Sequence, residues 1–326
     1  MTHNTRQAAR RNFMRTLAAG AVAASLPLAA WAQKQVVLKV GDQTRTIQSL
    51  LESAGLLNDL PYKLEFVQFP VAAPVMEALN AGALDIGYGG DAATTFSLAA
   101  GNPSRIVAAY RSDPSCIATI VPQNSPLKTV ADLAGKRVAV TRGSVGHLLL
   151  VAALTRHGVA LDKVDFHFLQ PADAYSAFTS GAVDAWSIWT IYVARAVLNN
   201  GARILVDGKG LVNNTAYQTA RTESLSSKRA EIADYVRRVA QARLWALANL
   251  DQYAKVWAPM IGATPELARY AYNMEKMTPV HIDKNIVADQ QKLVEYYASL
   301  KVIPKPFDIA PYFDLSFNQS IPVKLS

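Results

Sequence analysis

The chain has 326 residues, of which 51% are hydrophobic and 18% charged, with a formal net charge of +8 at pH 7. This length can bury a sizeable core and favours two domains or lobes. The charge is dispersed and includes no run of lysines and arginines that could follow a nucleic-acid backbone, so no nucleic-acid partner is expected. The single cysteine, Cys116, excludes an intramolecular disulfide.

The first 32 residues have the organisation of an export signal. Arg10-Arg11-Asn12-Phe13-Met14 is followed by a short apolar run, Leu17–Ala29, and then by Ala30-Trp31-Ala32. This pattern predicts a signal peptide over residues 1–32, and the paired arginines favour the twin-arginine route. A transmembrane anchor is the alternative, but the run is shorter than the roughly 20 residues that a bilayer requires and Pro27 interrupts it. With no cysteine at the end of this segment, no lipid anchor is expected, and the mature protein is predicted to be soluble and periplasmic.

Short strands and helices alternate after this leader. The first expected strands are Val36–Val40, Lys63–Phe69, Leu84–Gly87 and Arg105–Tyr110. Helices are expected between them, one from Pro74 to Gly82 and one that Asp91 caps and that ends at Gly101. Such alternation predicts an α/β fold, with a mainly parallel sheet flanked by helices.

A second unit of the same kind follows. Its expected strands are Ile117–Val121, Arg137–Val140 and Val183–Ile188. Ser144 is expected to cap a helix that stops at Gly158, and Asp173 to open a short helix that Gly181 closes. This pattern predicts a second sheet with its own helices.

Two tetrapeptides echo each other between these units. Gly82-Ala83-Leu84-Asp85 and Gly181-Ala182-Val183-Asp184 each join a helix end to a buried strand. The echo supports two similarly built lobes. The remainder is more helical, and the apolar spacing predicts one long amphipathic helix over Ser227–Asp251.

The chain is expected to cross between the lobes twice, near 112–116 and near 207–217, where it is polar and contains proline or glycine. Lobe I then comprises 33–114 and 215–326, and lobe II comprises 115–214. Two crossovers predict a hinged clamshell with its ligand in the cleft.

Several ordered segments carry a resemblance to a known family. They are Gln68–Asn80, Gly89–Gly101, Ser125–Leu133, Gly143–His147, Pro171–Trp189, Gln290–Lys292 and Ile303–Pro306. With these segments the chain resembles the aliphatic sulfonate-binding branch of periplasmic substrate-binding proteins, whose relatives bind taurine, nitrate or bicarbonate. The resemblance implies a type II clamshell, a monomer without cofactor or catalytic activity, and delivery of a small organic anion to an ABC permease in the inner membrane.

Two departures from the family pattern bear on the ligand. Val71-Ala72-Ala73 stands where the family often has glycines, which narrows one edge of the cleft. Trp189-Thr190-Ile191-Tyr192 stands where the family commonly has Trp-Asp-Pro-Tyr. The loss of that acid removes a negative charge, so taurine, with its amino group, is a weaker candidate than a plain sulfonate.

A sulfonate needs several N–H or O–H donors, and helix N-termini supply them together with a positive dipole. Two such ends are expected to form the anion clamp, Gly90-Asp91-Ala92 and Gly143-Ser144-Val145, with a hydroxyl from Thr94. Asp91 and Ser144 are also the residues that could merely cap their helices. An Asp91 carboxylate facing the ligand would repel it, so that side chain is expected to turn into its own helix.

The other candidate ligand-binding residues are Arg45, Arg142, Gln43 and Trp189. Either arginine could hold the anion through two parallel hydrogen bonds, although arginines are more often solvated. Gln43 follows the first strand at the mouth of the cleft. Trp189 is expected to pack against the apolar tail of the ligand, whereas Trp186 is expected in the core.

Other functions leave fewer signals. The five histidines are scattered, and no metal-ligand spacing is present. An enzyme of the sulfinate desulfinase kind would need Cys116 as its nucleophile, and its apolar neighbours suggest a buried thiol instead; enzymes related to thiamine-pyrimidine synthesis carry a cysteine-rich motif that this chain lacks. Binding of nitrate, a carboxylate or a pyrimidine on the same fold stays open.

Overall fold

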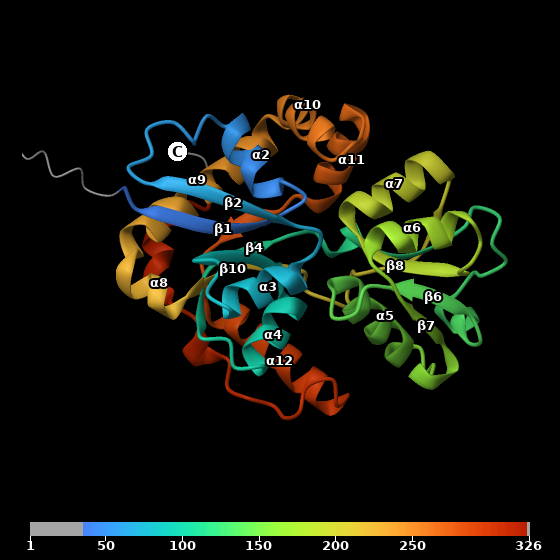
Figure 1. Ribbon diagram of the computed structural model, residues 1–326. Helices are drawn as coiled ribbons and strands as arrows, with labels where there is room; N and C mark the ends of the chain where they lie inside the picture. Colours follow the sequence, from blue (N-terminus) through green and yellow to red (C-terminus); the bar gives the residue numbers. More distant parts are fainter. Residues whose placement is uncertain (1–34, 325–326) are drawn as a thin grey trace, which may run out of the picture. The chain divides into compact units, whose positions relative to one another are not determined.

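Two mixed β-sheets organise the polypeptide in a computed structural model that describes residues 35–324. The leader predicted for residues 1–32 lies outside the described residues. The first sheet contains β1 (Val37–Gln43), β2 (Lys63–Phe69), β3 (Ile86–Gly90), β4 (Ser104–Arg111), β10 (Thr215–Arg221) and β11 (Thr278–Val280), in the order β11-β4-β10-β3-β1-β2. The second contains β5 (Ile117–Val121), β6 (Arg137–Val140), β7 (Asp165–Phe168), β8 (Ala185–Trp189) and β9 (Arg203–Asp207), in the order β7-β6-β8-β5-β9 (Figure 1).

The expectation of mainly parallel sheets holds for three neighbouring strands in each. Strands β2, β1 and β3 are parallel, as are β7, β6 and β8. Strand β10 runs antiparallel to both β3 and β4, and β5 runs antiparallel to both β8 and β9. Parallel neighbours need a crossover connection such as a helix, whereas the chain enters β5 and β10 directly from the other sheet.

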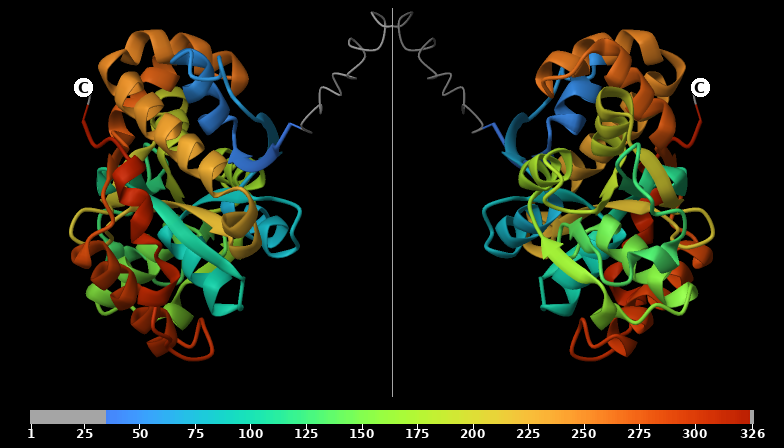
Figure 2. Two further views of the ribbon diagram at one scale, coloured as in Figure 1. Left: turned by 90° about the vertical axis from the view of Figure 1, so that its left-hand side faces the viewer. Right: turned by 90° about the vertical axis from the view of Figure 1, so that its right-hand side faces the viewer.

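Helices cover both faces of each sheet. Their bounds are α2 (Thr46–Ser53), α3 (Ala72–Asn80), α4 (Asp91–Ala99), α5 (Val145–Arg156), α6 (Pro171–Thr179), α7 (Thr190–Asn200), α8 (Thr222–Ser227), α9 (Arg229–Ala248), α10 (Leu250–Met260), α11 (Pro265–Glu275) and α12 (Lys284–Ser299). Helices α2, α9, α10 and α11 pack on one face of the first sheet, and α4 and α12 on the other (Figure 2). On the second sheet, α6 and α7 cover one face and α5 the other.

Side-chain alternation along the strands explains these layers. In β6, Val138 and Val140 face the α5 side while Ala139 faces α6 and α7, as the two-residue period of a strand requires. In β8, Trp186 is fully buried in the core under α6 and α7, as expected from the sequence.

Three helix boundaries differ from the expectation. Gly90, not Asp91, is the N-cap of α4, and Asp91 is the first helical residue. Helix α6 begins at Pro171 and not at Asp173, because proline at the first helical position lacks only an N–H that would be unpaired there. Helix α3 likewise begins at Ala72, with Pro74 inside its first turn.

The long helix expected over Ser227–Asp251 is α9, Arg229–Ala248, whereas Ser227 belongs to α8 and Asp251 to α10. Helix α9 ends at Ala248, and Asn249 interrupts the helical geometry with φ −125° and ψ 45° before α10 begins. The Trp245 carbonyl accepts both the backbone N–H and the side-chain amide of Asn249, each at 2.9 Å. Arg243, which breaks the apolar stripe of the sequence, is nevertheless fully buried.

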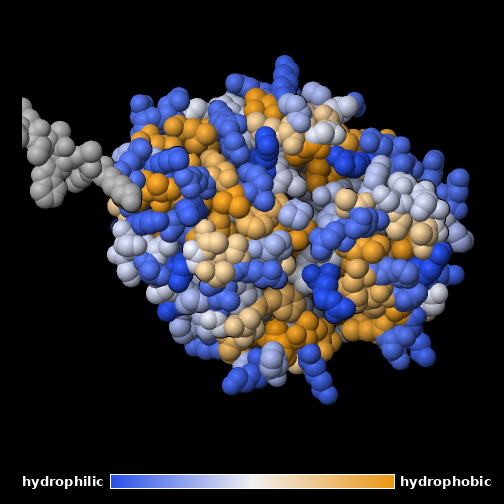
Figure 3. All heavy atoms as spheres, viewed as in Figure 1, coloured by the Kyte–Doolittle hydropathy of each residue, from blue (hydrophilic) through white to orange (hydrophobic). Residues whose placement is uncertain are grey.

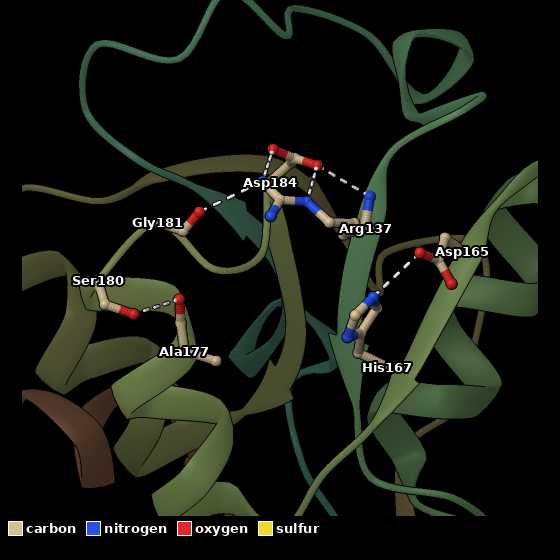
Figure 4. Close-up of polar contacts among 7 residues, drawn as sticks. All are labelled: Arg137, Asp165, His167, Ala177, Ser180, Gly181 and Asp184. Carbon is tan, nitrogen blue, oxygen red and sulfur yellow. Dashed lines mark hydrogen bonds and ion pairs between the residues drawn. The ribbon is translucent and has the colours of Figure 1, made fainter.

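The echoed tetrapeptides do occupy equivalent places in the two sheets. Asp85 accepts a hydrogen bond from the N–H of Lys39 at 2.8 Å, and Asp184 accepts one from the N–H of Arg137 at 2.9 Å (Figure 4). Each aspartate also donates its own N–H to the carbonyl of the same partner. Gly82 and Gly181, both at φ 75°, make the turn that aligns each aspartate with the neighbouring parallel strand.

In the part of the chain that the structure describes, no helix combines the length and apolar character that crossing a membrane requires. On the face seen in Figure 3, hydrophilic and apolar residues are interspersed, in keeping with the dispersed charge of the sequence.

Candidate functional site

A cavity of about 140 Å³ lies where the carboxyl ends of parallel strands from both sheets meet. Gln43 ends β1, Gly90 ends β3 and Trp189 ends β8, while Thr141 follows β6 directly. Ligands of open α/β sheets bind at this edge. The full lining is Gln43, Thr44, Thr46, Val71, Ala72, Ala73, Tyr88, Gly90, Ala93, Ile117, Thr141, Arg142, Gly143, Ser144, Val145, Trp189, Thr190, Ile191, Asn214, Ala216, Trp257, Glu275 and Met277.

The N-terminus of α5 presents donors to this cavity. Ser144 is its N-cap, and the Ser144 hydroxyl oxygen accepts the N–H of His147 at 3.2 Å. Because the oxygen is the acceptor in that bond, the hydroxyl proton stays free to donate to a ligand. The Val145 and Gly146 N–H groups, in the first turn of α5, make no hydrogen bond to the described residues.

His147 supports this helix end without carrying a charge. Its Nδ1 accepts the N–H of Gly143 at 3.3 Å, and its ring packs edge-on against Phe168. Burial, together with the neighbouring Arg142 charge, lowers the pKa of His147 to about 4. A neutral imidazole at physiological pH therefore holds Gly143 in place.

Arg142 brings a cation to the cavity wall. Its guanidinium lies over the Phe168 ring, 3.7 Å from the ring centre, and it forms no ion pair with the described residues. Stacking orients the planar group and leaves its N–H edge available to an anion.

The N-terminus of α4 reaches the same cavity through Gly90, and its acid is turned away. The Asp91 carboxylate accepts the N–H of Ala92 at 2.7 Å and that of Thr215 at 3.3 Å. It lines a second cavity of about 330 Å³ and not the first. Burial raises the pKa of Asp91 to about 6. The negative charge is thus kept off the cavity wall, although Asp91 is the first residue of α4 and not its cap.

Two further helix N-termini at the cavity have no counterpart in the sequence-based prediction. Helix α2 brings Thr46, its first residue, and α7 brings Thr190. The backbone is strained where each of these helices begins, because Thr44, Arg45 and Thr190 have positive φ values of 49°, 53° and 27°. The sequence does contain a signal for these two helix ends, because each helix begins within three residues of the end of a strand, as α4 does.

Asp42 occupies the deeper part of the α2 end. Its buried carboxylate accepts the N–H groups of Ile47 and Gln48, each at 3.0 Å. Burial raises the pKa of Asp42, and these bonds oppose that rise. Of the first residues of α2, only Thr46 therefore lines the cavity, and the N–H groups of Ile47 and Gln48 are not available to a ligand.

The remaining wall comes from the first sheet and its helices. The Gln43 side-chain amide donates to the carbonyl of Tyr88 at 2.7 Å, which fixes its orientation at the cavity. Trp257 of α10 and Glu275, the last residue of α11, complete this side.

The structure brings together most of the site residues proposed from the sequence. Gln43, Gly90, Arg142, Gly143, Ser144, Val145 and Trp189 all line the cavity. Ala92 and Thr94 are fully buried within α4 and lie outside its lining, as does Asp91. Arg45 lines an adjoining pocket that shares Thr44 and Ile191 with the cavity.

Cys116 is not part of the cavity lining, although its partner Asn214 is. The thiol is buried and accepts a hydrogen bond from the Asn214 amide at 3.2 Å. Burial raises the pKa of Cys116 to about 12, so a reactive thiolate is disfavoured. Among the described residues, no group of three or more histidine, cysteine, aspartate or glutamate side chains is placed to hold a metal ion.

Comparisons with known proteins agree on one family. The profile described as NMT1/THI5 like matches residues 62–249. A putative aliphatic sulfonates-binding protein of Escherichia coli is 31% identical over 303 residues, which are 92% of this chain and 95% of the relative.

Two solved structures extend this likeness to the fold. The alkanesulfonate-binding protein SsuA from Xanthomonas axonopodis pv. citri, bound to MOPS, has a TM-score of 0.81 at 27% identity and covers 87% of this chain and 99% of its own. The periplasmic aliphatic sulphonate binding protein SsuA from Escherichia coli has a TM-score of 0.78 at 30% identity, with coverages of 89% and 94%. With its two-sheet fold and its cavity at the strand ends, the chain belongs to the NMT1/THI5-like family, on the branch of the aliphatic sulfonate-binding proteins.

Proposed function

We propose that this protein is the periplasmic substrate-binding component of an ABC importer and that it captures an aliphatic sulfonate or a similar small organic anion. The observation that carries the proposal is the convergence of four helix N-termini, those of α2, α4, α5 and α7, on one cavity. The carboxylates of Asp42 and Asp91 already accept N–H groups at the ends of α2 and α4. The N–H groups of Val145 and Gly146, which make no hydrogen bond to the described residues, therefore make the α5 end the main anion site. Helix N-termini bind anions through free N–H groups and a positive dipole. The names of its relatives support the same ligand class.

The proposed binding mode uses donors only. A sulfonate stays ionised at physiological pH and offers three acceptor oxygens. The Ser144 hydroxyl and the N–H groups of Val145 and Gly146 meet one side of it, and the Arg142 guanidinium supplies charge. The apolar tail of the ligand lies against Trp189 and the alanines of the α3 end.

We propose that each sheet forms the core of one lobe and that the two lobes close on the ligand. The crossovers lie side by side, because Ser112 donates its N–H to the carbonyl of Asn214 at 3.2 Å. Bending there would move the ends of α4 and α5, which meet across the cavity, relative to each other. The closed form would then be presented to the membrane permease as a monomer.

An enzyme on this fold is the less favoured alternative. Its nucleophile would have to be Cys116, which is buried and outside the cavity lining. The Cys116→Ala variant is expected to keep ligand binding.

A thermal-shift screen of the mature protein tests the proposed function. Alkanesulfonates of increasing length, nitrate, sulfate, aromatic sulfonates and carboxylates are added in turn, since a ligand of the native state must raise the melting temperature. A rise with organic sulfonates that Trp189→Ala diminishes is expected. A rise with nitrate or carboxylates and with no sulfonate would overturn the sulfonate assignment.

A further inference from the structure

The cavity has a second, oppositely polarised end. Glu275 lies at the C-terminus of α11, where the helix dipole is negative, and it lines the same cavity as the set of helix N-termini. Its carboxylate forms no ion pair or hydrogen bond with the described residues. Glu275 is half-buried, and its carboxylate oxygens are not among the fully buried polar atoms without a partner, so they are accessible to a ligand in the cavity.

The cation whose charge acts on Glu275, Arg243, forms no ion pair with it. Arg243 is fully buried, and its guanidinium lies 5.2 Å from the ring centre of Tyr88 and 4.7 Å from that of Tyr110. The distance between the Arg243 nitrogens and the Glu275 oxygens exceeds the 4.0 Å of a salt bridge. Arg243 is absent from the cavity lining. Burial raises the pKa of Glu275, and the Arg243 charge opposes that rise.

Aromatic groups also line this cavity. Tyr88 and Trp257 share its wall with Glu275 and with the polarisable side chain of Met277. Trp257 is 3% exposed and stacks on Tyr253, so its ring is held rigidly. A cavity lined by both a carboxylate and aromatic rings can stabilise an alkylammonium group through charge pairing and cation–π contact.

We propose that Glu275 is a specificity-determining residue that binds a protonated amine of the ligand, so that the substrates are zwitterionic aminoalkanesulfonates and not plain alkanesulfonates. This inference rests on the proposed function, because the helix N-termini must take the sulfonate. It reverses the expectation drawn from Thr190, where the family commonly has an acid. The negative charge lost from the α7 end is supplied here by α11.

A pair of ligands of equal size tests the inference on the unaltered protein. 3-Aminopropanesulfonate and butanesulfonate differ by an ammonium in place of a methyl group, and their affinities are compared by isothermal titration calorimetry. We expect the amino compound to bind at least tenfold more tightly. Equal affinities, or tighter binding of butanesulfonate, would overturn the inference and leave the proposed function intact. Failure of both ligands to bind would count against the proposed function instead.

The Glu275→Gln variant assigns any preference to this residue. It keeps the size and polarity of the side chain and removes the charge. We expect the preference for the amino compound to fall to within about threefold while butanesulfonate binds as well as before or better. A preference that survives in Glu275→Gln would show that another group holds the amine. The melting temperature of the unliganded variant separates a binding effect from a folding defect, and Glu275→Asp, which keeps the charge, is the matched control.

Discussion

The Asp184 carboxylate accepts three hydrogen bonds from Arg137, on the neighbouring parallel strand. The Arg137 backbone N–H and Nε donate to one carboxylate oxygen of Asp184 at 2.9 and 3.1 Å, and a terminal guanidinium nitrogen donates to the other at 2.8 Å (Figure 4). The guanidinium also reaches the carbonyl of Gly181. One aspartate thus ties the turn before β8 to the first residue of β6, which sets the register of the strands that end at the cavity.

Asp184→Asn is expected to lower the melting temperature by a few degrees. The asparagine amide has one acceptor oxygen, and its NH2 group cannot accept the hydrogen bonds that the second carboxylate oxygen accepts from Arg137. Asp165→Asn is the matched control, since the Asp165–His167 pair at 3.0 Å is exposed and belongs to neither turn (Figure 4). Exposed pairs of that kind contribute little. Differential scanning calorimetry measures the melting temperature of both variants. Equal decreases would mean that the Asp184 hydrogen bonds stabilise the protein no more than an exposed ion pair does.

Asp85 occupies in the first sheet the place that Asp184 occupies in the second. Its carboxylate should make the stability of the protein depend on pH. Burial raises its pKa, but hydrogen bonds from Lys228, the Lys39 N–H and Ser224 outweigh that effect and hold the pKa below its ordinary value. A carboxyl group with a depressed folded-state pKa stabilises the protein above its unfolded pKa and loses this contribution as the pH falls through the folded value.

Asp85→Asn should therefore cost about 2 kcal/mol of unfolding free energy at pH 7, within the range for hydrogen bonds to charged groups. The difference from the unaltered protein should shrink below about pH 4, near the unfolded value. Urea unfolding at pH 7, 5 and 3 measures it. A difference that does not change with pH would exclude the charge as its source.

The fold was predictable because its signals are local. β2, β5 and β6 have the expected bounds, and the echo of Gly82–Asp85 in Gly181–Asp184 identified equivalent hydrogen-bonded turns. The structure departs from the prediction where a single residue decides whether a helix ends or continues. Asn249 ends a helix whose apolar spacing continues, and no periodicity reveals that choice.

Among the helix N-termini of the candidate site, those predicted from the sequence are the ones that a glycine marks. Gly90 and Gly143 drew attention to α4 and α5, whereas α2 and α7 begin through strained geometry at Thr44, Arg45 and Thr190 without a glycine. Glu275 could not be found from sequence, because it lies far along the chain and reaches the cavity only through the packing of α11.

Ser144 is expected to have two separable roles. Ser144→Ala removes the cap of α5 and also a proposed ligand donor, so it should lose about 1 kcal/mol of stability and bind sulfonate at least tenfold more weakly. Thr264→Ala removes the equivalent cap of α11, where the hydroxyl accepts the N–H of Leu267 away from the cavity. It should lose comparable stability with unchanged affinity. If both variants bound equally well, Ser144 would be a cap only.

The buried state of Cys116 predicts an inert thiol. Iodoacetamide should label the folded protein far more slowly than the unfolded chain, because burial raises the thiol pKa to about 12 and blocks access. Mass spectrometry with and without denaturant follows the reaction. Rapid labelling of the folded protein would reopen the enzymatic alternative.

Gly90 and Val145 bring the ends of α4 and α5 together across the cavity. A Cβ atom at Gly90 would lie 2.9 Å from a methyl carbon of Val145, although the Gly90 backbone, at φ −70° and ψ 167°, accepts any residue. Gly90→Ala should therefore weaken sulfonate binding by about tenfold through a contact that keeps the helix ends apart, with little loss of stability. Adding Val145→Ala removes the obstructing methyl groups and should restore affinity to that of Val145→Ala alone. Calorimetric titration of the three variants tests this coupling; additive losses would mean that the two helix ends do not approach each other when the ligand binds.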